Sequence, residues 1–467
     1  AQGPEAVTRV TSWYEFTNLF GGYNAAYPAT FGVGAFFSNG GSELFVKRLL
    51  HSDATKSSVN VQTSGSVTVA TFTAKNAGSD GNNLRVAVTA GTVASTYTIS
   101  VYKEGVAGTA MDITNDILLE RYENVVFDDN TSSSYAETVI NLISSYVTVS
   151  NSASGTPVLT VYPLTGGGNG TTVVAADYTA YKGGSSAVFE DFTSLDRALV
   201  LFLPNINAYI ASGVAGVYDA AISWAENNGG FVVAETAANL TPADALTFAS
   251  GLTASSNVAV YYPHVYVADP VGRSAQALRK VGPSGAVAGL YIGTDIAKGV
   301  FKAPAGLGSP LSGIVTTERS FSSGELDNLN SGSAPVNPIR QIPGAGLCVM
   351  GARTLKQDGT ANKYVNMRRS LIYIEKRLKG LTEFAIFENN DEKLWTKINT
   401  ALSTFLNDYR NQGGLRGTQD QAFFVKCDAQ NNTATSIANG EVHIQVGVAL
   451  QYPAEFIVID LSQKTAV

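Results

Sequence analysis

The chain has 467 residues, of which 45% are apolar and only 15% are charged, and its formal net charge is −7. This length and apolar content are sufficient for about two to four domains and argue against bulk disorder. The acidic balance disfavours general binding to a nucleic-acid backbone. The low charge fits a surface covered by copies of the same chain, and it fits a secreted β-rich protein about equally well.

The usual sequence marks of a metal site, a disulfide framework or a membrane span are missing. The two cysteines, Cys348 and Cys427, and the three histidines lie far apart in the sequence, which fits neither a zinc site nor a disulfide framework. The longest apolar runs, such as Ala198–Leu203, are far too short to cross a bilayer. We therefore expect no metal, no cofactor and no membrane insertion.

Residues 1–58 are expected to begin an α/β core. Ser12 and Glu15 have the spacing of a capping box, which predicts a helix that begins at Trp13 and ends at Gly21-Gly22. A second helix is predicted over residues 30–38, and the glycines that follow turn the chain into an apolar strand at 44–46.

Residues 59–184 show a different pattern, in which short β-branched and aromatic segments are separated by Gly, Asn, Asp and Ser. One helix is predicted within this region, over residues 135–144. The region is therefore expected to form a mostly-β domain inserted into the core. Its predicted strands are 66–73, 84–89, 97–102 and 158–162.

The α/β pattern returns over residues 185–345. Buried strands at 198–203, 231–234 and 258–262 alternate with two helices, one ending at Gly229 and one starting at Thr241-Pro242. A strand–helix–strand–helix–strand order predicts a parallel sheet covered by helices.

Residues 346–455 are expected to form a smaller α+β domain. Apolar residues step by three and four over 364–378 and again over 394–409, which predicts two helices. Alternation over 442–450 predicts a strand with one buried face, which Pro453 ends. Residues 456–467 are expected to form a C-terminal arm that contains an apolar strand. The predicted fold class is thus an α/β core with a parallel-rich, helix-covered sheet, an inserted mostly-β domain and a smaller α+β C-terminal domain.

No catalytic residue is predicted. Gly166–Gly170 is glycine-rich but is not followed by a helix, so a loop is favoured over a phosphate cradle. Ser284, between Pro283 and Gly285, has no placed base and is read as part of a turn. We expect structural or interface roles for His264 and a structural hydrogen-bonding role for Arg353, so the chain is not expected to be an enzyme.

Several motifs, kept in order along nearly the whole chain, resemble the contractile phage tail sheath family. The most specific is the stretch Val281–Gly289, which continues through Asp295 and Lys298-Gly299-Val300. The other stretches that carry the resemblance are Val10–Phe16, Phe36–Gly41, Ala74–Gly78, Gly81–Leu84, Glu120–Asn124, Tyr135–Asn141, Tyr261–Pro263, Asp269-Pro270, Lys302–Ala305, Val336–Arg340 and Gly351–Leu355.

The resemblance implies a structural subunit that polymerises with itself as stacked hexameric rings around an inner tail tube. It implies contacts with the tube protein, the baseplate and the tail terminator or neck proteins, and a place in the virion tail after assembly in the host cytoplasm. It also implies that the inserted β domain lies on the outer surface and the C-terminal domain faces the tube. The family has an extended N-terminal arm, whereas the sequence given opens at Ala1 almost at the first helix, so the arm is either missing or omitted.

In that family, chain termini add strands to the sheets of neighbouring subunits by β-augmentation. The candidate donor strand here is Phe456, Ile457, Val458, Ile459 and Leu461. A second candidate site is a basic helix face that meets an acidic tube: Lys363, Arg368, Arg369, Lys376, Arg377 and Lys379. A solvated helix face or ion pairs within the sheath explain the same charges equally well.

Two other functions remain open from sequence. One is the same sheath role in a phage-derived injection device or tailocin, which the neighbouring genes would distinguish from a phage. The other, supported by composition alone, is a β-rich surface adhesin or carbohydrate-active protein. That function would require paired carboxylates in a groove and a monomer or a small closed oligomer.

Overall fold

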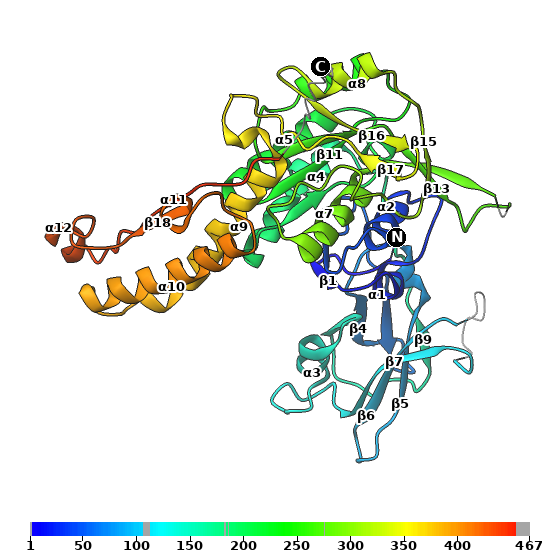
Figure 1. Ribbon diagram of the computed structural model, residues 1–467. Coiled ribbons are helices and arrows are strands. Elements are labelled where there is room, and N and C mark those ends of the chain that lie inside the picture. The colour runs from blue at the N-terminus through cyan, green and yellow to red at the C-terminus, as the bar shows by residue number, and fades with distance from the viewer. Residues whose placement is uncertain (1, 106–112, 182–183, 185, 275, 454–467) are drawn as a thin grey trace, which may run out of the picture. The chain divides into compact units, whose positions relative to one another are not determined.

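The computed structural model describes residues 2–105, 113–181, 184, 186–274 and 276–453 (Figure 1). Within this part the chain forms two compact units, each assembled from separate stretches of sequence. The first unit comprises Ala1–Gly22, Glu43–Asp191 and Tyr209–Ser212. The second comprises Tyr23–Ser42, Phe192–Ala208 and the described residues from Gly213 onward.

These boundaries differ from the expected ones at the start of the chain. Of the first 58 residues, only Tyr23–Ser42 lie with the α/β core, and the rest lie with the β-rich unit. Glu5 connects the start of the chain to the β-rich unit, because its N–H donates to Asn76 Oδ1 at 3.0 Å and its Oε1 accepts from Ala77 N at 2.7 Å. The C-terminal α+β segment is part of the second unit.

The first unit begins with strand β1 (Thr8–Val10) and helix α1 (Trp13–Phe20), and β1 pairs antiparallel with β2 (Leu44–Val46). Ser12 caps helix α1 as predicted, but the expected capping box is not complete. Ser12 Oγ accepts from Glu15 N at 3.1 Å, and Glu15 Oε2 accepts from Thr11 N at 2.7 Å. The bond to Ser12 satisfies an amide group that a helix start otherwise leaves without a partner, while Glu15 binds the amide of Thr11, the residue before the cap.

Two antiparallel sheets form the rest of this unit. The first has the order β3-β4-β8 and the second β7-β6-β5-β9. Their inward faces enclose the buried side chains of Val61, Phe72, Val86, Ile99 and the α3 residue Ile140. The elements are β3 (Ser58–Gln62), β4 (Thr68–Ala74), β5 (Leu84–Ala90), β6 (Tyr97–Lys103), β7 (Ile117–Val125), α3 (Ala136–Ile143), β8 (Val147–Asn151), β9 (Val161–Pro163) and α4 (Ala175–Thr179).

The second unit contains a five-stranded sheet of order β10-β11-β12-β16-β17. Strands β10, β11 and β12 are parallel, as the alternating pattern predicted. Strand β16 adds in parallel to β12, and β17 pairs antiparallel with β16. The strands are β10 (Val200–Phe202), β11 (Phe231–Glu235), β12 (Val258–Tyr262), β16 (Val336–Ile342) and β17 (Gly346–Val349).

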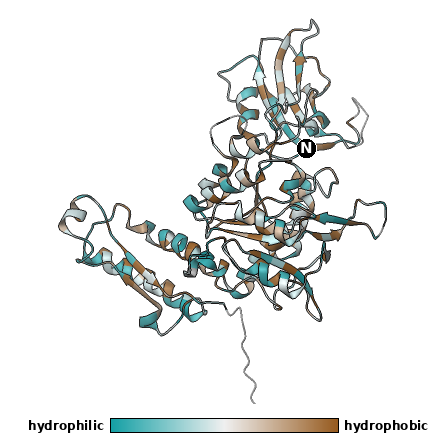
Figure 2. Cartoon of the chain, turned by 90° about the horizontal axis from the view of Figure 1, so that it is seen from above, coloured by the Kyte–Doolittle hydropathy of each residue, from teal (hydrophilic) through white to brown (hydrophobic). Residues whose placement is uncertain are grey.

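Helices α5 (Val214–Asn228) and α7 (Ser284–Lys298) both pack on β11, and every residue of β11 is buried. Burial on both faces is what a parallel sheet requires. Figure 2 shows brown, apolar segments along several strands and helices. Helices α6 (Pro242–Ser250) and α8 (Ser323–Asn330) pack against β16 of the same sheet. A small antiparallel sheet of order β14-β13-β15 adjoins it, formed by β13 (Val265–Ala268), β14 (Leu278–Val281) and β15 (Ile314–Thr317).

Glycines allow α7 to lie directly against α2 (Ala29–Ser38). A Cβ on Gly285 would come within 2.1 Å of Gly32 O, and one on Gly289 within 2.2 Å of Phe36 O. Glycine in a helix interior costs about 0.5–1 kcal/mol relative to alanine. Close backbone contact therefore explains why the most specific sequence motif carries glycines four residues apart.

The C-terminal part of the second unit contains two long helices, α9 (Val365–Thr382) and α10 (Glu392–Asn411), as predicted (Figure 1). Their shared core contains Met367, Ile374, Leu406 and Tyr409. Short elements follow: α11 (Gln419–Ala422), β18 (Phe423–Lys426), α12 (Ala434–Ala438) and β19 (Gln445–Val448), with β18 and β19 antiparallel.

Candidate assembly interface

In α/β proteins ligands usually bind at the carboxyl ends of the parallel strands, and at the end of β11 the chain's own side chains form a buried hydrogen-bond network. Glu235, at the end of β11, is fully buried, and its carboxylate accepts from Asn205 N at 2.6 Å and from Ser284 N at 3.1 Å. Asn205 Oδ1 in turn accepts from Gly282 N at 2.7 Å. Burial raises the pKa of Glu235, and the two amide donors oppose that shift. This network positions the start of α7 at the carboxyl end of β11.

The residues considered for catalysis have structural surroundings. Ser284 lies buried in the first turn of α7, and buried His264 places Nε2 2.8 Å from Thr236 O. Arg353 Nη1 donates to Asn330 O at 2.7 Å, which fits the expected hydrogen-bonding role. Gly166–Gly170 lies in a loop between β9 and α4.

Within the described residues, no group of three or more His, Cys, Asp and Glu could hold a metal ion. Cys348 and Cys427 are buried free thiols. No helix in the described part of the chain combines the length and the apolar character needed to cross a membrane.

Arg369, one of the six basic residues assigned to the tube-facing helix, is buried inside the second unit. It forms a bidentate ion pair with Asp295 of α7, with N–O distances of 3.0 and 2.5 Å. Its guanidinium also lies 4.6 Å from the ring centre of Tyr291. Burial opposes the charge on Arg369, but the Asp295 carboxylate raises the pKa of Arg369 overall. A side chain in this position fixes α9 to α7 and is not presented to a partner.

Three more of the six also contact the chain itself. Arg368 Nε donates to Asn257 Oδ1 at 3.0 Å, while Lys376 and Lys379 pair with Asp196 at 2.6 and 2.7 Å. The two ammonium groups hold the pKa of Asp196 at about 2. Sequence patterns gave no signal for Asp196, because it is distant along the chain and lies in a loop.

Lys363 and Arg377 lie near aromatic rings, at 4.9 Å from the Tyr364 ring centre and 5.9 Å from that of Phe405. Of the six basic side chains, Arg377 and Lys379 are the exposed ones. The assignment of Arg369 to a tube-facing surface is therefore corrected: Arg369 is buried in a pair with Asp295, and reversing its charge would disrupt the fold as well as any partner contact.

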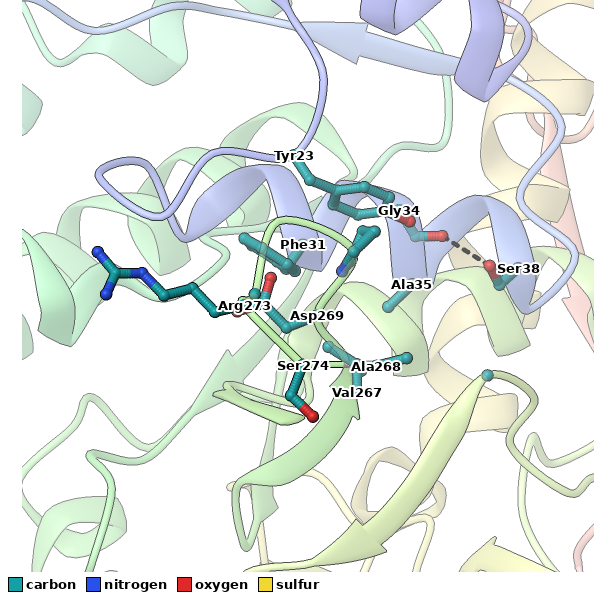
Figure 3. A pocket seen from close by; sticks show the side chains of 13 residues that line it. Tyr23, Phe31, Gly34, Ala35, Ser38, Val267, Ala268, Asp269, Arg273 and Ser274 are labelled. Atoms are coloured by element: carbon teal, nitrogen blue, oxygen red, sulfur yellow. Dashed lines mark hydrogen bonds between the residues drawn. The ribbon is translucent and has the colours of Figure 1, made fainter. Parts of the chain in front are cut away.

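A pocket of about 470 Å³ lies between α2 and the strand β13 with the loop that follows it (Figure 3). The rings of Tyr23 and Phe31 stack at a tilt on one side, with centroids 4.9 Å apart. Its full lining is Tyr23, Phe31, Gly34, Ala35, Ser38, Val267, Ala268, Asp269, Pro270, Gly272, Arg273, Ser274 and Gly313.

Arg279 fixes the shape of this pocket. It pairs with Asp269 at 2.8 Å, and its guanidinium lies 4.7 Å from the centre of the Phe31 ring. Arg273 is exposed, and Figure 3 shows its side chain directed outward from the other lining residues. The pocket therefore has aromatic and aliphatic walls with a basic group at its rim.

The candidate donor strand, Phe456, Ile457, Val458, Ile459 and Leu461, lies outside the described residues. The last described strand, β19, pairs with β18 inside the second unit.

The C-terminal region of the chain matches a known protein family. Residues 357–464 match the model of the phage tail sheath C-terminal domain. The tail sheath protein of Vibrio phage KVP40 is 25% identical over 178 residues, which are 38% of this chain and 26% of that protein. The tail sheath protein of Salmonella phage ViI is 23% identical over 127 residues, which are 27% of this chain and 19% of that one. The matches thus span about a quarter or less of these curated relatives.

Solved structures extend the similarity of fold to nearly the whole chain. The anti-feeding prophage helical sheath in its contracted state matches 98% of this chain and 88% of its own, with a TM-score of 0.59 and 21% identity. The sheath complex of the extracellular contractile injection system PVC, also contracted, matches 99% and 88%, with a TM-score of 0.58 and 20% identity. The C-terminal region therefore matches the phage tail sheath C-terminal domain family, and nearly the whole chain shares the fold of these sheath proteins.

Proposed function

We propose that the chain polymerises as stacked hexameric rings around an inner tail tube and contracts to drive that tube through the host envelope during genome delivery. The observation that carries this proposal is the match of residues 357–464 to the sheath C-terminal domain, within a chain whose fold resembles contracted sheaths almost end to end. The proposed partners are other copies of the chain, the tube protein, the baseplate and the terminator or neck proteins. Its proposed place is the virion tail, assembled in the host cytoplasm.

The architecture suits a subunit that moves as rigid bodies. Each unit has its own buried core, and α9 is fixed to α7 by the Arg369–Asp295 pair. Rotation of such bodies changes contacts between copies while each core stays intact. The free energy is stored during assembly behind a kinetic barrier, so contraction needs no nucleotide hydrolysis.

We assign the connections between copies to the C-terminal segment. The run from Phe456 to Ile459 is apolar and rich in β-branched residues, with Leu461 following Asp460, and this composition suits a strand that adds to the edge of a neighbouring sheet. Main-chain hydrogen bonds would keep copies connected while their bodies rotate.

The sheath role in an injection device or tailocin is the second candidate, because one of the nearly full-length structural matches is the sheath of an extracellular contractile injection system. The chain's chemistry is the same in either case. Genes for a capsid beside this one would identify a phage, and genes for toxins without a capsid would identify an injection device.

Negative-stain electron microscopy of the purified full chain, with and without its tail tube, is expected to show striated hollow tubes or stacked rings. A variant ending at residue 453 should form few or no long polymers, because it lacks the proposed donor strand. A variant of full length with a shuffled 456–461 segment distinguishes the effect of losing this strand sequence from the effect of shortening the chain. Monodisperse monomer at high concentration of the full chain would contradict polymerisation.

The proposed tube contact rests on the exposed Arg377 and Lys379 of α9. Reversing both to glutamate should lower co-assembly with the tube, while tube-free polymers still form, because both side chains lie at the surface. Pelleting of tube with sheath at low and high salt measures the effect. The matched control is reversal of exposed Lys393 and Lys397 on α10. Equal pelleting of the α9 and α10 variants would remove α9 from the tube contact.

A further inference from the structure

The loop between α9 and α10 presents an aromatic side chain to solvent. Phe387 is fully exposed, and Ile386 beside it is 65% exposed. Phe387 also has a φ of +66°, in the left-handed region that bulky residues rarely adopt. Strained backbone at an exposed apolar residue persists only where the surroundings impose it, and it often marks a site of function.

Hydrogen bonds on both sides of Phe387 hold the loop in place. Glu388 N donates to Ala385 O at 3.2 Å. Asn390 Nδ2 donates to Glu441 O at 2.9 Å, and Asn390 Oδ1 accepts from Trp395 Nε1 at 2.8 Å. The phenyl group is therefore displayed from an anchored loop, which lowers the entropy lost when a partner binds it.

The same unit carries a pocket of matching chemistry. The pocket beside α2 has aromatic walls, Tyr23 and Phe31, and a volume of about 470 Å³, ample for one aromatic side chain. Aromatic rings favour tilted and edge-to-face packing, and the half-buried Tyr23 offers such a surface to a third ring, whereas Phe31 is buried against Tyr23 and Arg279. The charges of the loop and the pocket are also complementary, because the exposed carboxylate of Glu388 follows Phe387 and the exposed Arg273 lies at the pocket rim.

We propose that the Phe387 loop of one copy inserts into the α2–β13 pocket of a second copy of this chain. The inference rests on the proposed function in that it supplies one contact of the polymer. The Phe387 loop and the pocket occupy different places on one chain, so the contact is heterologous and propagates from copy to copy. A buried aromatic anchor in a pocket is the usual form of an interface hot spot.

Disulfide trapping tests the contact directly. F387C and A268C place thiols on the loop and on the exposed, pocket-lining end of β13. The natural cysteines, Cys348 and Cys427, are buried and do not compete. An oxidised mixture of the two single variants should give a covalent dimer that reductant dissolves, and the double variant should give a ladder of multimers. A disulfide needs Cα atoms within about 7 Å, so it reports a specific contact.

Assembly measurements give an independent reading. F387A should raise the lowest protein concentration that supports polymers by about tenfold or more, as expected for a hot-spot residue. E388R and R273E should each weaken assembly, and the combination that exchanges the two charges should restore it. The matched control is Y14A, which removes an exposed aromatic from α1 of the other unit and should leave assembly unchanged.

The outcomes separate this contact from the proposed function. Absence of the mixed dimer, when both single variants react with a thiol reagent, overturns the contact whether or not tubes form. Tubes that form at the usual concentration with F387A also overturn it and leave the sheath function standing. A mixed dimer without tubes under any condition supports the contact and counts against polymerisation.

Discussion

Arg369→Ala is expected to lower the free energy of unfolding of the second unit by about 3 kcal/mol, the lower end of the range for removing one partner of a buried ion pair. The variant leaves the Asp295 carboxylate, which is only 16% exposed, without its bidentate partner. It also removes the cation–π contact with Tyr291. Urea unfolding measures the change, followed by the fluorescence of Trp224 and Trp395, both buried in this unit, in a Trp13→Phe background.

The control for this prediction is Arg377→Ala, on the exposed face of the same helix, which should stay within about 0.5 kcal/mol of the parent. A double variant, Arg369→Met with Asp295→Leu, should recover most of the loss, because an apolar pair of similar volume leaves no charge buried alone. Equal unfolding midpoints for Arg369→Ala and Arg377→Ala would show that the pair does not hold α9 to α7.

Gly289→Ala is the second large effect, with an expected loss of about 3 kcal/mol, the upper end of the range for overpacking. The new Cβ would lie 2.2 Å from Phe36 O, a backbone atom that cannot move without shifting α2. The loss is expected despite the gain of about 1 kcal/mol in helix propensity that alanine brings. Thermal and urea unfolding of the full chain both report it.

Gly216→Ala is the matched control, because Gly216 also lies in a helix of the second unit but has open space around its Cβ position. There the propensity gain acts alone, so the variant should be as stable as the parent or more stable by up to about 1 kcal/mol. If both glycines tolerate alanine equally, the α2–α7 contact is looser than the geometry indicates.

Local chemistry made much of the fold predictable. The capping pair Ser12 and Glu15 fixed the start of α1, and the Thr241-Pro242 pair fixed the start of α6, since a cap depends on neighbours in sequence. The parallel order of β10, β11 and β12 followed from the alternation of strands and helices, because short right-handed connections leave few other arrangements.

Contacts between distant residues could not be predicted in this way. The apolar periodicity of α9 identified the face toward α10, but a second face is also buried, and Arg369 lies on it. Nothing in the sequence near Arg369 indicates Asp295, so a run of basic residues looked like an exposed surface. The pairing of Glu5 with Asn76 and Ala77 was equally invisible, which is why the first residues were placed with the α/β core.

The glycine contact between α2 and α7 has a consequence for how the chain is made. Gly32 and Gly285 are roughly 250 residues apart, and at about 5–20 residues per second a ribosome needs on the order of 10–50 s to cover that distance. During this interval α2 has left the ribosome with Phe31 and Phe36, both buried in the finished protein, and its partner helix does not yet exist. The intervening β strands can meanwhile complete their sheets. Newly made chains therefore pass through a stage in which one unit is folded while the apolar helix α2 still lacks its partner. The yield of folded subunits should then depend on how well a chaperone shields α2 at that stage.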